Sequence, residues 1–163
     1  MKGIEGLTLL NYTSARPHPL LMSVTMAIDP AANNPQNPVT LLTVLVVDDD
    51  GSIRTIVGQY LEHCGFAVKL AASGAEALEI YRADPSAIVL VDIRMPGLDG
   101  LATLAALKEI NPDCACCMMS GGLDDSTGEE LQTAGATVVI KKPFSPAQLR
   151  QLILSMDKER RRA

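Results

Sequence analysis

The stretch Ile88-Val89-Leu90-Val91-Asp92-Ile93-Arg94-Met95-Pro96-Gly97-Leu98-Asp99-Gly100 decides how the rest of the chain is interpreted. Four consecutive apolar residues, 88–91, predict a strand buried on both faces, as in a parallel sheet. Pro96 and Gly97 end that strand and turn the chain. We therefore expect Asp92 at the carboxyl end of a central strand, where open α/β sheets bind ligands. A solvated Asp that caps the next helix is the alternative interpretation of this stretch.

Composition limits the class of protein. The chain has 163 residues, of which 47% are hydrophobic and 20% charged, as expected for one globular domain with an additional segment. Aromatic residues make up 3% and Trp is absent, so the core must be aliphatic. The net charge of −5 argues against direct nucleic-acid binding. No apolar run approaches the roughly 18 residues of a membrane span, so we expect no membrane partner.

The cysteines bear on the compartment. Three of the four lie in one short segment, and C-x-C-C is not a usual zinc spacing. We expect these thiols to be reduced and mostly buried, in a cytoplasmic protein. A redox-sensitive cluster is the alternative, which nothing else in the sequence supports. The cysteines are Cys64, Cys114, Cys116 and Cys117.

The chain divides into three parts by composition. Residues 1–40 show no sustained hydrophobic period and end in a linker, 29–38, that is rich in Pro and Asn. We expect this extension to be disordered or loosely ordered. Residues 41–158 form the predicted folded domain, and residues 159–163 a basic tail.

A strand pattern alternates with a helix pattern five times. Short connections favour right-handed crossovers, so the sequence predicts an α/β fold with a five-stranded parallel sheet, doubly wound as (βα)5. The predicted strands are 43–47, 66–70, 88–91, 114–119 and 137–140, and the predicted helices are 53–64, 74–84, 98–110, 123–134 and 146–156.

Polar residues of distinct chemistry follow four of the strands. All carboxyl ends of a parallel sheet lie on one edge, so we expect these side chains to face a common crevice. Clustered carboxylates repel one another unless a cation is present, and oxygen ligands in an open cleft suit Mg²⁺. A carboxylate between the metal and a Lys can act as a nucleophile towards a phosphoryl group. The residues are Asp48, Asp49 and Asp50 after the first strand, Asp92 after the third, Ser120 after the fourth and Lys142 after the fifth.

Four segments carry a resemblance to a known family. Residues 45–50, residues 91–100, Met119-Ser120-Gly121 and Lys142-Pro143-Phe144 resemble the receiver domain of two-component response regulators. The motifs occur in the family's order, at the family's separations. The resemblance implies the flavodoxin-like (CheY-like) fold with strand order 2-1-3-4-5.

The resemblance also assigns roles to the acidic residues. Asp92 looks like the phosphoacceptor, which takes its phosphoryl group from the phosphohistidine of a sensor histidine kinase or a histidine phosphotransfer protein. Asp49 would bind Mg²⁺ directly and Asp48 through water. Arg94 would offer its backbone carbonyl to the metal. Asp50 falls at a position that the family leaves variable, and we interpret it as a helix-start residue.

The remaining site residues are assigned to phosphoryl binding and switching. They are Ser120, Gly121 and Lys142, and the Lys142–Pro143 bond is expected to be cis, as in the family. Val139 stands where the family often has an aromatic residue, so an aromatic switch coupled to Ser120 is not expected. Small residues after Ser120 predict a mobile loop and easy phosphoryl exchange.

Little sequence follows the last predicted helix, which suggests a stand-alone receiver. Such a protein would not be an enzyme, although self-phosphorylation from small donors and self-dephosphorylation are expected. Output would pass to a partner protein through the face made by the fourth helix, fifth strand and fifth helix, from a monomer or a phosphorylation-dependent dimer. The alternatives are a receiver separated from its output domain, a phosphorylation-independent binding receiver, and a Mg²⁺ phosphohydrolase. Against the last, Arg94 stands where a second acid would be needed.

Overall fold

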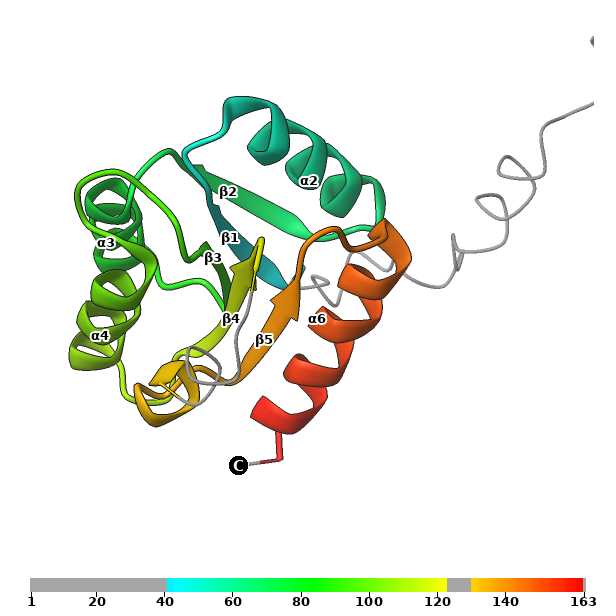
Figure 1. The fold of residues 1–163 in the computed structure, drawn as a ribbon. Helices are drawn as coiled ribbons and strands as arrows, with labels where there is room; N and C mark the ends of the chain where they lie inside the picture. Colours follow the sequence, from blue (N-terminus) through cyan, green and yellow to red (C-terminus); the bar gives the residue numbers. More distant parts are fainter. Residues whose placement is uncertain (1–40, 123–129, 163) are drawn as a thin grey trace, which may run out of the picture. The chain divides into compact units, whose positions relative to one another are not determined.

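The sheet is the centre of the fold. The computed structural model describes residues 41–122 and 130–162, and within them five parallel strands form one sheet in the order β2-β1-β3-β4-β5 (Figure 1). The α/β fold and the strand order expected from the sequence are confirmed. The predictions for residues 1–40 and 123–129 lie outside the described residues. The strands are β1 (Thr43–Val47), β2 (Ala67–Ala71), β3 (Ile88–Asp92), β4 (Ala115–Ser120) and β5 (Val138–Lys141).

Helices cover both faces of the sheet (Figure 1). α3 (Gly74–Ala83) and α4 (Gly100–Ile110) pack on one face, and α2 (Gly51–His63) and α6 (Pro146–Arg160) on the other. Residues 130–133, at the end of the predicted fourth helix, are also helical. No helix in the described ranges is long and apolar enough to cross a membrane.

Apolar side chains alternate between the two faces of the central strands. In β1, Leu45 and Val47 join the core under α3 and α4, whereas Val44 and Val46 join the core under α2 and α6. All four are fully buried. Continuous apolar runs therefore mark the central strands, because both of their faces are covered. β2, which Lys69 interrupts, lies at an edge of the sheet.

Polar N-caps fix where the helices begin. Asp50, Ser73, Asp99 and Ser145 each accept a backbone N–H from the first turn of the helix that follows. α6 begins at Pro146, as predicted, and Ser145 is its N-cap. Because these caps place the helices after the carboxyl ends of the strands, they also fix the loops at that edge of the sheet.

Ser73 and Glu76 have the sequence spacing of a capping box, but the box at the start of α3 forms only in part. Ser73 accepts the Glu76 N–H at 3.2 Å, but the Glu76 carboxylate accepts the N–H of Ala72 rather than that of Ser73. The Glu76 carboxylate therefore binds the backbone one residue earlier than in a full capping box.

The last helix is longer than the sequence predicted. α6 continues to Arg160, so residues 159 and 160, which were assigned to the basic tail, are helical. Asp157 accepts from Arg160 at 2.9 Å and from Arg161 at 2.7 Å. These pairs, three and four residues apart, support the last turn, and basic groups there complement the helix dipole.

The cysteines are free thiols, as predicted. Cys114, Cys116 and Cys117 are buried in or next to β4, and Cys64 is partly buried at the end of α2. They serve as small apolar residues in a core that is mostly aliphatic, although Phe66 and Tyr81 are also buried in it.

Candidate functional site

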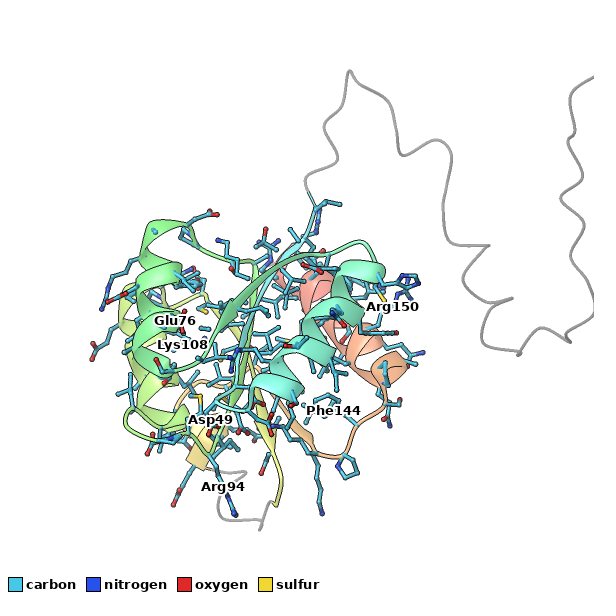
Figure 2. The ribbon with its side chains drawn as sticks, turned by 90° about the horizontal axis from the view of Figure 1, so that it is seen from above. Asp49, Glu76, Arg94, Lys108, Phe144 and Arg150 are labelled. Carbon is cyan, nitrogen blue, oxygen red and sulfur yellow. The ribbon has the colours of Figure 1, made fainter. Side chains whose placement is uncertain are left out.

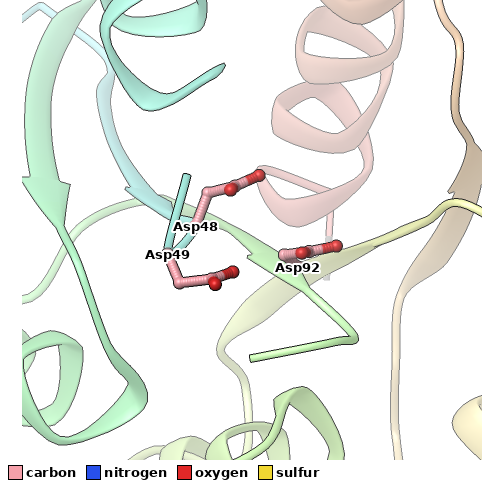
Figure 3. A group of neighbouring side chains, drawn as sticks. All are labelled: Asp48, Asp49 and Asp92. Carbon is pink, nitrogen blue, oxygen red and sulfur yellow. The ribbon is translucent and has the colours of Figure 1, made fainter. Parts of the chain in front are cut away.

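Three carboxylates meet at the carboxyl edge of the sheet. Asp48 and Asp49 directly follow β1, and Asp92 is the last residue of β3 (Figure 3). Because Val47 pairs with Val91, the two strands end at the same level. One oxygen from each carboxylate lies within 4.8 Å of the others. The structure therefore brings together the acidic residues that the sequence placed in one crevice.

Lys142 reaches the same place from the residue after β5. Its Nζ donates to Asp48 Oδ2 at 2.8 Å and lies 3.2 Å from Asp92 Oδ1. Lys141 is exposed, so the two neighbouring lysines have different environments. The Lys142–Pro143 peptide bond is cis. A single ammonium thus bridges two carboxylates of the acidic cluster.

Asp92 and Lys142 are partly buried, and their pKa values are shifted. Burial raises the pKa of the Asp92 carboxyl above its ordinary value, although the charge and hydrogen bond of Lys142 oppose the shift. Burial also lowers the pKa of Lys142, but the hydrogen bond to Asp48 and the charges of Asp48 and Asp92 outweigh it. The pKa of Lys142 therefore lies above its ordinary value.

Asp50 does not join the acidic cluster. Its side chain accepts the N–H groups of Ser52 at 2.8 Å and Ile53 at 3.2 Å, which is the helix-start role predicted for it. These two hydrogen bonds lower the pKa of the Asp50 carboxyl. Its own N–H donates to Asp48 Oδ1 at 2.9 Å and so helps to hold that carboxylate.

Ser120 ends the strand next to Asp92. Its neighbour Met119 is the register partner of Asp92, and Ser120 itself is 2% exposed. The Ser120 hydroxyl oxygen accepts the Gly122 N–H at 3.2 Å, and its carbonyl accepts the Lys142 N–H at 2.6 Å. No atom lies within 4 Å of the place where a Cβ on Gly121 would stand. Most of the loop that was predicted to be mobile lies outside the described residues.

Arg94 lies in the loop that follows β3. Its side chain is exposed and points away from the body of the domain (Figure 2). The loop is closed by the N–H of Gly100, which donates to the Ile93 carbonyl at 3.0 Å. A Cβ on Gly100 would come within 2.4 Å of the Asp92 carbonyl oxygen. Only glycine therefore allows α4 to begin this close to Asp92.

The residues at this edge fit a hard divalent cation. The possible ligands are carboxylate oxygens, which Mg²⁺ prefers, and they come from a cluster whose mutual repulsion a cation would relieve. Asp48 is 1% exposed, whereas Asp49 is exposed and Asp92 is 8% exposed. Asp49 and Asp92 are thus the more accessible ligands, and Asp48 lies deeper, beneath Lys142.

Two features, one at the site and one between α3 and α4, were not predicted from the sequence. Arg54 donates to the Asp48 carbonyl at 2.6 Å. Thr103 packs so closely on α3 that a Cβ on Gly74 would lie 2.1 Å from its hydroxyl oxygen. The position of Arg54 four residues after the helix cap was visible, but nothing in the sequence showed which way its side chain turns.

Comparison with known proteins agrees with this geometry. A family model described as the response regulator receiver domain matches residues 44–154. The C4-dicarboxylate transport transcriptional regulatory protein DctD of Rhizobium meliloti is 37% identical over 119 residues, which are 73% of this chain and 26% of that protein. The probable transcriptional regulator ycf27 of Porphyridium aerugineum is 38% identical over 115 residues, 69% of this chain and 47% of that protein. The chain thus spans less than half the length of these two relatives.

Solved structures give the same result. A response regulator receiver domain protein (CheY-like) from Methanospirillum hungatei JF-1 superposes with a TM-score of 0.73 at 28% identity, covering 76% of this chain and 98% of that one. The chemotaxis protein CheY4 of Vibrio cholerae superposes with a TM-score of 0.69 at 28% identity, covering 71% and 98%. With the family model, the strand order and the acidic edge in agreement, the chain belongs to the response regulator receiver domain family.

Proposed function

We propose that this receiver domain accepts a phosphoryl group on Asp92 from the phosphohistidine of a sensor histidine kinase or a histidine phosphotransfer protein. The observation that carries the proposal is the position of Asp92. Its carboxylate lies in a cluster with those of Asp48 and Asp49, and the Lys142 ammonium, which also contacts Asp48, lies 3.2 Å from it. The chain is then a phosphoacceptor and not an enzyme that turns over a separate substrate.

The chemistry is a single displacement. A carboxylate oxygen of Asp92 attacks the phosphorus of the phosphohistidine, the P–N bond breaks, and its electron pair returns to the imidazole, which takes up a proton. The product is a mixed anhydride on Asp92. Burial raises the pKa of the Asp92 carboxyl, and the charge and hydrogen bond of Lys142 oppose this shift, so Lys142 favours the ionised, nucleophilic form of the carboxylate.

Positive charge from two sources would support the step. Asp48, Asp49 and Asp92 would hold a Mg²⁺ ion, which supplies charge that neutralises the phosphoryl oxygens. Lys142 donates to Asp48 and Asp92 before the reaction and is close enough to turn towards a phosphoryl oxygen afterwards. The Ser120 hydroxyl, at the end of the neighbouring strand, is the group that would follow the phosphoryl group and change the local structure.

Signal output would be a shift between two conformations. Lys142 leaves Asp48 when it turns to the phosphoryl group, and Lys142 directly follows β5, next to α6. We propose that a downstream protein contacts the surface formed by residues 130–133, β5 and α6, and that phosphorylation changes how tightly it binds. Passage of the phosphoryl group onward in a relay is the other output compatible with this site.

The test is intact-mass measurement after incubation of the full chain with acetyl phosphate and Mg²⁺. Wild type should gain one phosphoryl group, and Asp92→Asn should gain none. Asp113→Asn, which replaces an exposed acid outside the site, should behave as wild type. Wild type incubated with acetyl phosphate and EDTA in place of Mg²⁺ should gain no phosphoryl group.

Other results would change the proposal. A wild type that gains no phosphoryl group and releases no phosphate from the donor would contradict phosphoryl transfer and favour a receiver that binds partners without phosphorylation. A phosphoryl group that persists in Asp92→Asn would place the acceptor elsewhere. Continuous release of phosphate without a trapped adduct would favour a hydrolase.

A further inference from the structure

We propose that Arg54 is a positioning residue, which holds the Asp48–Asp49 turn in the geometry that receives the divalent cation. The inference deepens the proposed function and rests on it, because it assumes that the acidic cluster binds Mg²⁺. It assigns a role to a side chain from α2 that touches no carboxylate of the cluster.

Arg54 is attached to the turn at two points. Its backbone N–H, in the first turn of α2, donates to the Asp50 carbonyl at 2.9 Å. Its guanidinium Nη1 reaches back six residues and donates to the Asp48 carbonyl at 2.6 Å. One residue therefore spans the segment that carries Asp49, from the end of β1 to the start of the helix. A charged donor makes the second hydrogen bond a strong one.

The Asp48 carbonyl depends on this contact. The other polar groups of Asp48 have partners of their own: its N–H donates to the Ala71 carbonyl at 3.2 Å, and its carboxylate accepts from Asp50 and Lys142. Because Asp48 is 1% exposed, loss of the guanidinium would leave a buried carbonyl oxygen without this donor. The turn would then move to find another donor and would take both carboxylates with it.

The charge of Arg54 acts in the opposite direction. A guanidinium near the cluster repels an incoming cation, so a purely electrostatic role predicts that a neutral residue at position 54 strengthens Mg²⁺ binding. A positioning role predicts weaker binding, since groups that orient metal ligands typically contribute about tenfold or more to metal affinity. The sign of the change therefore separates the two roles.

The experiment is calorimetric titration of the full chain with Mg²⁺, because the protein has no Trp to report binding by fluorescence. We expect Arg54→Met to bind about tenfold more weakly than wild type. Arg54→Lys, which keeps the charge and one donor, should recover part of the affinity. Arg82→Met, in the last turn of α3, is the matched control and should match wild type.

A second readout needs no metal. The Asp50 N–H donates to Asp48 Oδ1, so its hydrogen exchange reports whether the turn is held. In the metal-free protein, Arg54→Met should exchange this proton several times faster than wild type. The Asn111 N–H, which donates to the Leu107 carbonyl at the end of α4, should exchange at the same rate in both proteins.

The outcomes are distinct. Folded Arg54→Met that binds Mg²⁺ as tightly as wild type, or more tightly, overturns the inference; if Arg54→Met does not fold, Arg54→Gln is judged by the same criterion. Wild type that binds no Mg²⁺ contradicts the proposed function itself. Wild type that binds Mg²⁺ while the neutral variants are unaffected contradicts only the role of Arg54.

Discussion

The Lys142 ammonium donates to Asp48 Oδ2 at 2.8 Å, although the two residues are 94 positions apart in the chain. The contact joins the ends of β1 and β5, which are not neighbours in the sheet. The Asp48 side chain is 1% exposed and that of Lys142 is 19% exposed, so water screens the pair only weakly. In the metal-free protein, Lys142 is therefore the cation that compensates the acidic cluster.

Replacement of Lys142 should destabilise the metal-free protein. Lys142→Met leaves the Asp48 carboxylate buried beside two like charges, and we expect a loss of about 2 kcal/mol in the free energy of unfolding at pH 7. Urea denaturation followed by circular dichroism measures the change. Addition of Mg²⁺ should restore more stability to the variant than to wild type, because the ion takes over the compensating role.

Lys141→Met is the matched control for this prediction. Lys141 is the exposed neighbour of Lys142, and its replacement should change the unfolding free energy by less than about 0.5 kcal/mol. Equal stability of the two variants would show that Lys142 does not compensate the cluster.

The start of α4 against the Asp92 backbone gives a second prediction. A Cβ on Gly100 would lie 2.4 Å from the Asp92 carbonyl oxygen and 2.6 Å from the Ile93 Cα. Both are backbone atoms, so no side chain can move aside. We expect Gly100→Ala to lower the unfolding free energy by about 1–3 kcal/mol. Gly51→Ala, where the nearest atom is 3.7 Å away, should leave stability unchanged or raise it. A Gly100→Ala protein as stable as wild type would contradict the close approach.

How much could be predicted from the sequence depended on how far apart in the chain the interacting residues lie. Local features were predicted well, because the apolar run of β3, the Ser145-Pro146 helix start and the Asp50 cap rest on nearby residues. The shared edge of Asp48, Asp92 and Lys142 followed from the parallel topology, because all carboxyl ends of a parallel sheet lie on one edge whatever the strand order. The strand order itself came from the family resemblance.

What was missed depends on side-chain direction and close packing. The contact of Arg54 with the Asp48 carbonyl needs a particular rotamer, and the fit of Thr103 against Gly74 needs the crossing of two helices. Neither leaves a periodic signal in the sequence. The single-residue shift of β2 has a similar cause: the Phe66 N–H donates to the Leu61 carbonyl at 3.1 Å, so Phe66 ends the turn after α2 instead of starting the strand.

Alkaline pH should destabilise the fold through Tyr81. Tyr81 is 1% exposed, and burial raises its pKa from 10.0 to about 12. The pKa of Tyr81 is higher in the folded than in the unfolded chain. The stability that the protonated Tyr81 contributes is therefore complete below pH 10 and is lost between pH 10 and about 12. Within that window wild type should lose about 1.4 kcal/mol per pH unit more than Tyr81→Phe.

Urea denaturation at several pH values measures this difference. Tyrosinate absorbance is a second measurement, and because the protein has no Trp, no indole absorbance overlaps with it. In this measurement one Tyr should titrate only as the protein unfolds. Parallel pH profiles for wild type and Tyr81→Phe would contradict the assignment.

Burial should also protect three of the four thiols. It raises the pKa of Cys114, raises that of Cys116 well above the ordinary value, and raises that of Cys117 to about 12. Because the thiolate is the reactive form, a disulfide reagent at neutral pH should modify the partly buried Cys64 first and the other three only on unfolding. Absorbance of the released thiol measures the rates, and Cys64→Ser should remove the fast phase. A fast phase that remains in Cys64→Ser would come from the buried thiols and would show that β4 opens in the native protein. The strand that leads to Ser120 would then be more mobile than its burial implies.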